Sequence, residues 1–492
     1  MQTQVAPNLD NCLPESELSD EELLGSDAVP ALVQDALIWC SLHGLLVGDK
    51  DGKNSGVTPG VGLVHAPVSL LPTPFPRPLF EQAVEVAPIF NELVDKVSQD
   101  SEFLFSTLER ARKTDSFTAG LLDIYRATLD KGIKEDIRLG LHRSDYMLDK
   151  ATGGLLQIEL NTISSSFAAL GTQVSRLHRH IVNRAGARSK LEPQNVPENA
   201  SFEAMTDGIA EAWRQYGDDE AVVLFVVQPA ERNMYDQLWM ADRLWDAHGI
   251  RSVRRTLTEI EKDGALDGDR TLSISGQRVS VVYFRAGYTP TDYPSDTEWR
   301  ARLLMEESSA VKCPSISYHL TGAKKIQQEL ARPGVLERFI TNEKDAALLR
   351  RHFAGLWALE GEGSEEIIEK AIADPEGFVL KPQREGGGNN IYGSDVPAKL
   401  QELQGTDGLA AYILMQRIFP PVKKSYLLRG GEWSQQDTLS ELGIFGTYLR
   451  NGEKVVINQP AGHLLRTKTA SSNEGGVAAG YGVIDSPYLT SK

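Results

Sequence analysis

The feature that most constrains the fold is an unbroken, largely β-branched apolar run at residues 221–227. Such a run is typical of a parallel strand that is buried on both faces. A helical pattern follows at 231–248, then a strand pattern at 250–256 and a further buried strand at 279–284. Strand, helix and strand at this spacing predict a small α/β sub-domain from about 218 to 320.

The chain has 492 residues, which is long for one core and predicts two or three packed sub-domains. Helical spacing at 29–43, 88–97 and 117–129 predicts that the first third is rich in helix up to about Leu148. The sequence also predicts strands at 155–161, 378–381, 410–418 and 439–450, and a helix at 202–216. We therefore expect a mixed α/β fold.

Composition excludes several classes of protein. The net charge of −17 argues against binding to nucleic acid or to an anionic membrane. The three cysteines, Cys12, Cys40 and Cys313, are far apart, which indicates buried thiols in a reducing compartment. No apolar run is long enough to span a bilayer, and residues 1–27 resemble neither a signal peptide nor an Arg-rich transit peptide. We expect a mobile leader at 1–27 and a cytoplasmic protein.

The segment FVLKPQREGGGNN, residues 378–390, carries the strongest chemical signal. A strand pattern leads into Lys381, Glu385 and three successive glycines. Successive glycines let the backbone turn its N–H groups toward a polyphosphate, and a carboxylate can bind the Mg²⁺ that bridges phosphates. The segment predicts a phosphate site, although a Gly-rich surface loop shows the same glycines. No Gly-Lys-Ser/Thr follows, so it is not a P-loop.

Two further pairs alternate along expected strands. Glu159 and Asn161 share one face of a strand and could bind Mg²⁺ together with Glu385, or could face solvent. Arg466 and Lys468 also share a face and precede the Gly-rich segment 474–480, as expected for anion binding under a mobile loop. The alternative for this pair is a solvated basic surface.

Single residues give weaker signals. Glu441 interrupts an apolar strand pattern and could accept hydrogen bonds from ribose hydroxyls or an ammonium, or could lie at a strand edge. Arg143, Lys324 and Arg285 are candidates for binding anions, and the last follows a buried strand, where ligands bind in α/β folds. His178 has no second ligand nearby and is expected to be structural or exposed.

The chain resembles the eukaryotic glutathione synthetase family. The resemblance rests on the runs LHRSDYM, QIELNTIS, ERNMYDQ, VVYFRAGY, KKIQQEL, FVLKPQREGGGNN, SELGIFG and HLLRTK…GGVAAG, which occur in the family's order between 141 and 480. It implies a homodimeric ATP-grasp ligase with an inserted Rossmann-like domain. The reaction would join γ-glutamylcysteine to glycine through an acyl phosphate, with ATP as co-substrate and Mg²⁺ as cofactor. The implied division is a leader at 1–27, a helix-rich part of the ATP-grasp core at 28–217, an α/β substrate-binding domain at 218–323, and a nucleotide-binding part at 324–492.

The resemblance also implies site residues. The metal ligands would be Glu159, Asn161 and Glu385. Contacts with ATP would come from Glu159, Lys324, Lys381, Glu385, Gly386, Gly387, Gly388, Asn389, Asn390, Tyr392, Met415, Gln416, Arg417, Ile418, Glu441, Lys468 and Glu474. Contacts with the dipeptide and product would come from Arg143, Ile163, Ser164, Ser165, Ser166, Glu231, Arg232, Asn233, Gln237, Arg285, Ala286, Gly287, Tyr288, Arg466, Val477 and Ala478. We expect Arg143, Arg466 and Lys381 to be catalytic.

This chain departs from the family's pattern at two places. Some members have Asp in place of Ala286, and some have Glu-Lys in place of Gln416-Arg417. Three alternatives remain: the same ligase chemistry with β-alanine or serine as the acceptor, a catalytically silent nucleotide-binding protein, and an NAD-dependent oxidoreductase. The last lacks support because no G-x-G-x-x-G follows the strand at 221–227.

Overall fold

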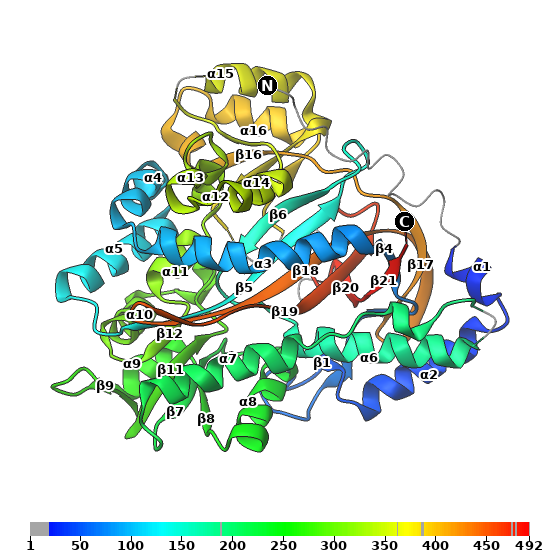
Figure 1. Ribbon diagram of the computed structural model, residues 1–492, viewed down its shortest axis with the longest axis horizontal. Coiled ribbons are helices and arrows are strands. Elements are labelled where there is room, and N and C mark those ends of the chain that lie inside the picture. The colour runs from blue at the N-terminus through cyan, green and yellow to red at the C-terminus, as the bar shows by residue number, and fades with distance from the viewer. Residues whose placement is uncertain are drawn as a thin grey trace.

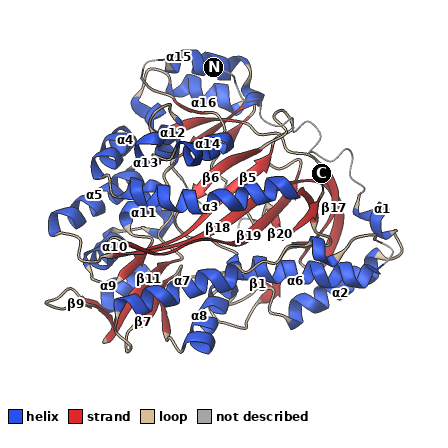
Figure 2. Ribbon diagram, in the orientation of Figure 1, coloured by secondary structure: helices blue, strands red, loops and turns tan. Residues whose placement is uncertain are grey.

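The computed structural model describes residues 19–186, 189–361, 363–384, 388–473, 476–477 and 480–491. Within them the protein is a mixed α/β fold, as predicted (Figures 1 and 2). The helices are α1 (Asp20–Leu24), α2 (Val29–Leu42), α3 (Arg77–Ser98), α4 (Ser101–Thr114), α5 (Ser116–Lys131), α6 (Ala168–Ala185), α7 (Ser201–Tyr216), α8 (Met234–His248), α9 (Leu257–Asp263), α10 (Asp296–Glu307), α11 (Ile316–Thr321), α12 (Lys324–Ala331), α13 (Leu336–Phe339), α14 (Glu343–His352), α15 (Ser364–Ala373) and α16 (Asp395–Leu403).

The strands form larger sheets and two short pairs. They are β1 (Leu46–Gly48), β2 (Leu63–His65), β3 (Val68–Ser69), β4 (Thr73–Pro76), β5 (Ile137–Leu148), β6 (Leu155–Asn161), β7 (Val222–Val226), β8 (Ser252–Arg255), β9 (Gly264–Leu266), β10 (Leu272–Ile274), β11 (Gln277–Phe284), β12 (Val311–Cys313), β13 (Leu356–Ala358), β14 (Phe378–Pro382), β15 (Ile391–Tyr392), β16 (Tyr412–Gln416), β17 (Lys423–Arg429), β18 (Glu432–Asn451), β19 (Lys454–Thr469), β20 (Gly482–Asp485) and β21 (Pro487–Thr490). The short pairs are β1–β2 and β4–β21.

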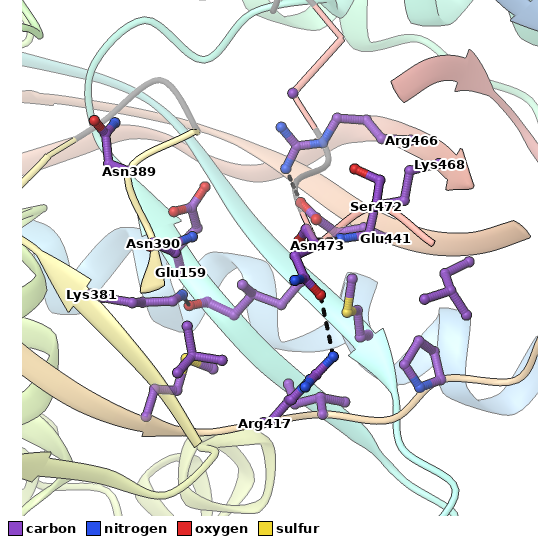
Figure 3. A pocket seen from close by; sticks show the side chains of 18 of the residues that line it. Glu159, Lys381, Asn389, Asn390, Arg417, Glu441, Arg466, Lys468, Ser472 and Asn473 are labelled. Carbon is purple, nitrogen blue, oxygen red and sulfur yellow. Dashed lines mark hydrogen bonds and ion pairs between the residues drawn. The ribbon is translucent and has the colours of Figure 1, made fainter. Parts of the chain in front are cut away.

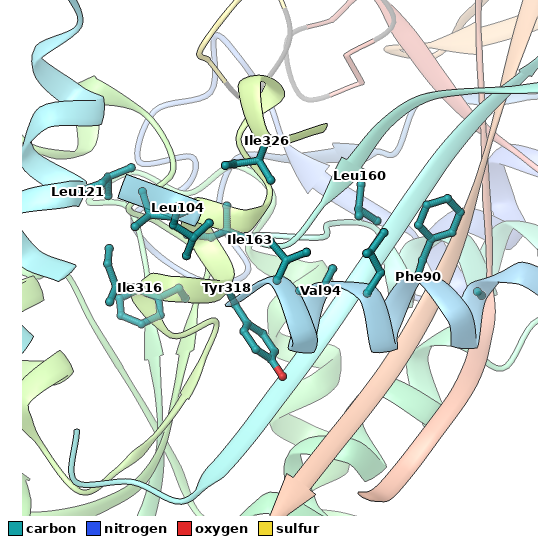
Figure 4. Packing of buried hydrophobic residues seen from close by; sticks show 14 of the residues in the cluster. Phe90, Val94, Leu104, Leu121, Leu160, Ile163, Ile316, Tyr318 and Ile326 are labelled. Carbon is teal, nitrogen blue, oxygen red and sulfur yellow. The ribbon is translucent and has the colours of Figure 1, made fainter. Parts of the chain in front are cut away.

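A central sheet has the order β17-β3-β20-β19-β18-β5-β6. Figure 1 shows α3 lying across one face of β5 and β18, while α6 and α7 contact the strands from the other face. The core on the α3 side joins Phe90 and Val94 of α3 to residues of α4, α5, β6, α11 and α12 (Figure 4). The sheet is therefore covered on both faces.

The prediction that the first third is rich in helix up to about Leu148 fails at β5, which is a strand between β18 and the edge strand β6 of this sheet. Its polar residues 142–145 are consecutive, so the sequence shows no alternation there. Both faces of this part of the strand are buried, since Leu141 belongs to one core cluster and Tyr146 to the other. Polar residues occur on both faces as well, so no apolar–polar alternation marks the strand. The other elements agree with the predictions to within a few residues, except that α3 begins at Arg77, well before the predicted 88, and β18 extends well before 439.

A second sheet has the order β8-β7-β11-β10-β9, with β12 also paired to β11. The β7 strand is parallel to both β8 and β11, and every residue in it is buried, as its sequence predicts. The chain leaves β7 through α8 to reach β8 on one side, and later places β11 on the other side. The order reverses between β7 and β11, which is where ligands bind in such sheets, at the carboxyl ends of the strands.

A smaller sheet, β13-β16-β14-β15, carries α15 and α16 on one face. Leu380 and Leu414 pack against these helices. Alternation along the strands then turns Val379, Lys381 and Met415 to the opposite face, where they line a cavity.

The expected mobile leader does not include α1. Asp20 is fully buried, and its carboxylate binds Lys423 Nζ at 2.8 Å and the Tyr426 backbone N–H at 2.9 Å. Residues 1–18 lie outside the described residues. In the part of the chain that the structure describes, no helix has the length and apolar character required to cross a membrane.

Candidate active site

A cavity of about 470 Å³ lies where the central sheet meets the four-stranded sheet. Figure 3 shows Glu159 and Lys381 on one side of it and Glu441, Arg466 and Lys468 on the other. The loop that follows β16 and the segment after β19 complete its walls. Segments far apart in the sequence therefore build one site.

Basic side chains dominate the described part of this wall. They are Arg143, Lys150, Lys324, Lys381, Arg384, Arg417, Arg466 and Lys468, against two carboxylates, Glu159 and Glu441. The whole chain carries a net charge of −17, so this excess of positive charge is local. A cavity of this kind favours a multiply charged anion such as a polyphosphate.

Glu159 lies within this group of cations. Its Oε2 is 3.8 Å from Lys324 Nζ, and Lys381 Nζ donates to the Ile158 carbonyl next to it at 2.9 Å. Burial raises the pKa of the Glu159 carboxyl, but the surrounding lysines and arginines outweigh burial and lower its pKa to about 2. Glu159 is therefore ionised at neutral pH and can act as an oxygen ligand.

Asp145 holds the two arginines that were expected to be catalytic. Its carboxylate accepts hydrogen bonds from Arg143 Nε at 2.6 Å and Nη2 at 2.8 Å, and from Arg466 Nη2 at 2.9 Å. Arg466 also donates to Glu441, which is directly opposite it in the β18–β19 pair. Charge-assisted bonds of this kind fix the guanidinium planes at the cavity wall. The sequence analysis missed Asp145; its signal was the Arg-Ser-Asp alternation on β5.

Asn161 is oriented by the same carboxylate. Its Nδ2 donates to Asp145 Oδ2 at 2.9 Å and to the Arg143 carbonyl at 3.2 Å. The amide oxygen, Oδ1, accepts no hydrogen bond within the described residues and remains available as a ligand. No group of three His, Cys, Asp or Glu side chains gathers anywhere in these residues. A metal site would therefore consist of Glu159, this amide oxygen and other oxygen donors.

Apolar residues line the side of the cavity near the four-stranded sheet. Val379 and Met415 are paired across β14 and β16, and Ile158 and Ile418 also line the cavity. The Gln416 side chain accepts from the Gly355 N–H at 3.0 Å, so it stabilises the strand instead of pointing freely into the cavity. This slot suits a flat heteroaromatic ring.

The departure from the family at Arg417 has a structural account. Arg417 donates to Glu376 and, at 3.2 Å, to Asn473 Oδ1, which belongs to the segment after β19. Its guanidinium also lies over the Phe419 ring, 5.4 Å from the centroid. Figure 3 shows that Arg417 and Asn473 together bound the cavity. The arginine thus links the apolar slot to the segment after β19.

Most of the predicted residues that the structure describes gather at this cavity. From the ATP and metal sets these are Glu159, Asn161, Lys324, Lys381, Asn389, Asn390, Tyr392, Met415, Gln416, Arg417, Ile418, Glu441 and Lys468; from the dipeptide set they are Arg143, Ile163, Ser164, Ser166, Tyr288, Arg466 and Val477. Lining residues that the sequence analysis missed are Met147, Lys150, Ile158, Phe167, Val379, Arg384, Phe419, Pro420, Val422, Leu439, Ala470, Ser472, Asn473 and Gly476. Many of the missed residues lie in loops, where no periodicity gives a signal.

Other predicted residues do not line the cavity. These are Ser165, Glu231, Arg232, Asn233, Gln237, Arg285, Ala286, Gly287 and Gly388. Glu385, Gly386, Gly387, Glu474 and Ala478 lie outside the described residues. Their described neighbours on both sides, such as Arg384 and Asn389, or Asn473 and Val477, do line the cavity.

Several of the remaining dipeptide residues form a largely buried polar cluster beside this cavity, at the carboxyl ends of β7 and β11, where the crevice of such a sheet lies. Glu231 accepts from the Asn233 N–H at 2.9 Å and from Gln237 Nε2 at 2.8 Å. Arg285 Nη2 donates to Asp236 at 3.3 Å and to Ser166 Oγ at 3.0 Å. Because Ser166 also lines the large cavity, the crevice adjoins it.

The loop between β6 and α6 joins these two regions. Its residues Ser164 and Phe167 have φ values of 51° and 70°, which side chains larger than hydrogen rarely adopt. Phe167 is held by a hydrogen bond from its N–H to Asp236 at 2.8 Å, and Ser164 donates to the Phe284 carbonyl at 3.2 Å. Backbone strain held in this way is common at functional sites.

Cys40, Cys313 and His178 do not line the cavity. Cys40 and Cys313 are buried, and burial raises the pKa of both thiols to about 12, so neither is a nucleophilic thiolate. His178 is fully buried and binds the Ser69 carbonyl and Ser486 Oγ. The prediction that these groups are structural is confirmed, while Cys12 lies outside the described residues.

The fold and the cavity define an α/β protein that binds an anionic ligand between two sheets. Comparison with known proteins adds the family. The profile of the family described as eukaryotic glutathione synthase, ATP binding domain, matches residues 26–489. The chain is 56% identical to the chloroplastic glutathione synthetase of Arabidopsis thaliana over 96% of this chain and 87% of that protein. It is 46% identical to glutathione synthetase of Homo sapiens over 86% and 90%, respectively.

A solved structure shares the whole fold. A glutathione synthetase-like effector from Globodera pallida, in its apo form, superposes with a TM-score of 0.75 at 26% sequence identity, over 97% of this chain and all of that one. The chain belongs to the eukaryotic glutathione synthase family. This is the family that the sequence motifs indicate, and its members are ATP-dependent ligases.

Proposed function

We propose that this protein is a glutathione synthetase, which joins γ-glutamylcysteine to glycine with cleavage of ATP to ADP and phosphate. The observation that carries the proposal is the basic cavity in which Asp145 holds Arg143 and Arg466, in a chain of this family. The relatives named glutathione synthetase favour glycine as the acceptor over β-alanine or serine.

The cavity accommodates ATP in two halves. The slot formed by Ile158, Val379, Met415 and Ile418 would hold the adenine, and the lysines that line the same cavity would bind the phosphates. Glu441, which also lines the cavity, would accept hydrogen bonds from the ribose hydroxyls. The residues that lie outside the described part, Glu385, Gly386, Gly387 and Glu474, belong to the same proposed set.

The donors at the cavity fit Mg²⁺. This ion prefers oxygen ligands, and the Glu159 carboxylate and the Asn161 amide oxygen provide two of them, with Glu385 proposed as a third. When bound, Mg²⁺ would neutralise charge on the phosphates. Chelation should abolish ADP release and added Mg²⁺ should restore it, which would separate a required ion from an incidental one.

The protein's own contribution to the reaction is to bind and orient the substrates and to protect the reacting groups. A carboxylate oxygen of the cysteinyl end attacks the γ-phosphorus of ATP, and the bond to the β-γ bridging oxygen breaks to release ADP. The glycine nitrogen then attacks the acyl carbon, and phosphate leaves. Arg143 and Arg466, already fixed by Asp145, stabilise the oxygens on which charge develops, and Lys381 contributes from the opposite wall.

We also propose the division expected from the sequence, 28–217, 218–323 and 324–492, with α1 of the expected leader 1–27 packed on the last part through Asp20. The second sheet, β7 to β12, falls within 218–323, and the central sheet combines strands of 28–217 and 324–492. Limited proteolysis should cleave first near these boundaries if the parts are separate folding units.

A homodimer belongs to the same proposal. Ile38 and Leu42 are 49% and 76% exposed and are four residues apart on α2, so they share a face. Val57 and Val61, 62% and 40% exposed, lie in the adjoining segment between β1 and β2. We propose that a second copy covers these exposed apolar side chains. Light scattering should give twice the mass of the chain, and Leu42→Lys should lower it.

The cellular compartment of the protein is also part of the proposal. The sequence analysis expects the cytosol, whereas two plant relatives are named as chloroplastic. We propose that the protein works in one of these two compartments. Imaging of the full gene product fused to a fluorescent protein distinguishes them.

The first experiment is to measure ADP release with ATP, Mg²⁺ and γ-glutamylcysteine, with glycine, β-alanine, serine or no acceptor. We expect release that needs the dipeptide and is fastest with glycine. Faster release with another amine would keep the ligase and change its product. Binding of ATP without any release would favour a silent nucleotide-binding protein instead.

A further inference from the structure

The crevice next to the large cavity contains buried polar atoms that lack partners. They are Asn233 Oδ1, Gln237 Oε1, Arg254 Nη1 and Arg285 Nε, none of which has a hydrogen-bond partner within the described residues. Asn233 and Gln237 both bind Glu231. A buried polar atom without a partner costs free energy comparable to a lost hydrogen bond. Several such atoms at one place indicate a site built for a polar ligand.

Strand register places Arg254 on the face of the sheet that borders this crevice. Arg254 of β8 is directly opposite Phe225 of β7, which is opposite Tyr283 of β11. Residues in register on neighbouring strands point to the same face. Phe225 and Tyr283 pack in one cluster with Met240 and Leu244 of α8.

The carboxylate and the two guanidiniums of this crevice lie at the same end of the sheet. Arg285 is two residues beyond Tyr283 and shares its face, while Glu231 lies just before the start of α8. Burial lowers the pKa of Arg254, and Arg285 lowers it further, while Glu231 opposes both. An added anion would relieve the repulsion between the two guanidiniums.

The chemistry of the crevice matches one part of the dipeptide. Asp236 already pairs with Arg285, which leaves the Arg254 guanidinium and the Glu231 carboxylate to bind a group that carries both a carboxylate and an ammonium. The amino-acid end of γ-glutamylcysteine is such a group. The cysteinyl carboxylate at the other end must reach Arg143 and Arg466 in the large cavity. Ser166 connects the two, because it lines the cavity and binds Arg285.

We propose that Arg254 binds the α-carboxylate of the γ-glutamyl group and thereby determines specificity for that end of the substrate. Glu231 binds the adjacent ammonium. Arg254 is not among the residues that the family resemblance implies, and this inference rests on the proposed glutathione synthesis.

The test compares Arg254→Ala with Arg255→Ala, because Arg255 is the next residue on β8 and points to the other face. Each variant and the wild type is assayed for kcat/KM of ADP release with three substrates. These are γ-glutamylcysteine, 4-aminobutyrylcysteine, which lacks the α-carboxylate, and glutarylcysteine, which lacks the α-amino group. Melting temperature and ATP titration confirm that each variant is folded and binds nucleotide.

We expect Arg254→Ala to lower kcat/KM at least about 30-fold for both substrates that keep the α-carboxylate, and to leave 4-aminobutyrylcysteine nearly unchanged. Arg254→Lys should recover part of the loss, and Arg255→Ala should behave as wild type. An equal loss for all three substrates, no loss, or the same selective loss in Arg255→Ala would overturn the proposal. Absence of ADP release from the wild type with γ-glutamylcysteine and glycine would instead reject the proposed function.

Discussion

Two buried aspartates act on opposite faces of the same pair of strands, β5 and β18. Asp145 of β5 binds Arg143 and Arg466 on the face that opens into the cavity. Asp95 of α3 packs against the other face. It accepts hydrogen bonds from Arg138 at 2.7 Å, Tyr318 at 2.7 Å, Tyr448 at 3.2 Å and Arg450 at 3.4 Å.

Asp95 and Asp145 each bind two arginines, but the two clusters have different roles. Arg138 and Arg143 are five positions apart on β5, so alternation turns them to opposite faces. On the α3 side, arginine and tyrosine donors surround Asp95 and no described cavity adjoins it. On the other side, Arg466 lines the cavity. A carboxylate with two arginines is therefore framework or active site according to what lies beside it.

Asp145→Asn tests whether this aspartate serves the active site. Arg143 loses the negative charge that fixes it, and Arg466 keeps only Glu441 of its two carboxylate partners, so we expect kcat for ADP release to fall by about 10²–10³. ATP affinity, measured by titration, should change only a few-fold. A variant that keeps more than a tenth of the wild-type turnover would show that these arginines do not need their anchor.

Asp95→Asn should have the opposite profile. It leaves Arg138 and Arg450 without their buried counter-charge, which should lower the free energy of unfolding by about 3 kcal/mol in urea denaturation. Below the melting temperature, kcat should equal that of the wild type. Loss of turnover in the folded variant would mean that the two faces are coupled.

The contribution of the Asp95 carboxylate to stability should depend on pH in the acid range. Burial raises the pKa of Asp95, but the hydrogen bond and charge of Arg138, together with Tyr318 and Arg450, hold it below its ordinary value. Its contribution to stability is complete above the unfolded pKa of about 4 and is lost as pH falls through the lower folded pKa. Stability curves of wild type and Asp95→Asn should converge below pH 4; parallel curves would assign the acid sensitivity to other groups.

The smallest expected effect comes from Tyr448→Phe. This removes one long hydrogen bond to Asp95, so we expect a loss of about 0.5–1 kcal/mol in unfolding free energy and no change in turnover. Tyr318→Phe, which removes the shorter bond of 2.7 Å, should cost more. The reverse order would show that the distances do not rank these two bonds.

Local periodicity predicted part of the site well. Glu159 and Asn161 alternate on β6, Arg466 and Lys468 alternate on β19, and all four line the cavity. The link between Asp145 and Arg466 could not be found in this way, because the two residues are 321 positions apart and meet only through the pairing of β5, β18 and β19. A short segment records which face a residue occupies, but not which distant strand faces it.

The crevice was harder to predict for the same reason. Glu231 and Arg285 each follow a buried strand, so the end of the sheet on which they lie could be read from the sequence. Arg254 gave no signal, because SVRR at 252–255 shows neither an apolar run nor a motif. Its role becomes visible only when the register with β7 is known.

The length of β18, from Glu432 to Asn451, affects how the protein unfolds. One strand carries Glu441 at the cavity and Tyr448 and Arg450 at Asp95. Backbone amides at its two ends should therefore exchange with solvent deuterium in a single opening event. On heating, enzymatic activity and secondary structure should then be lost with the same rate constant, and no long-lived folded but inactive form should accumulate.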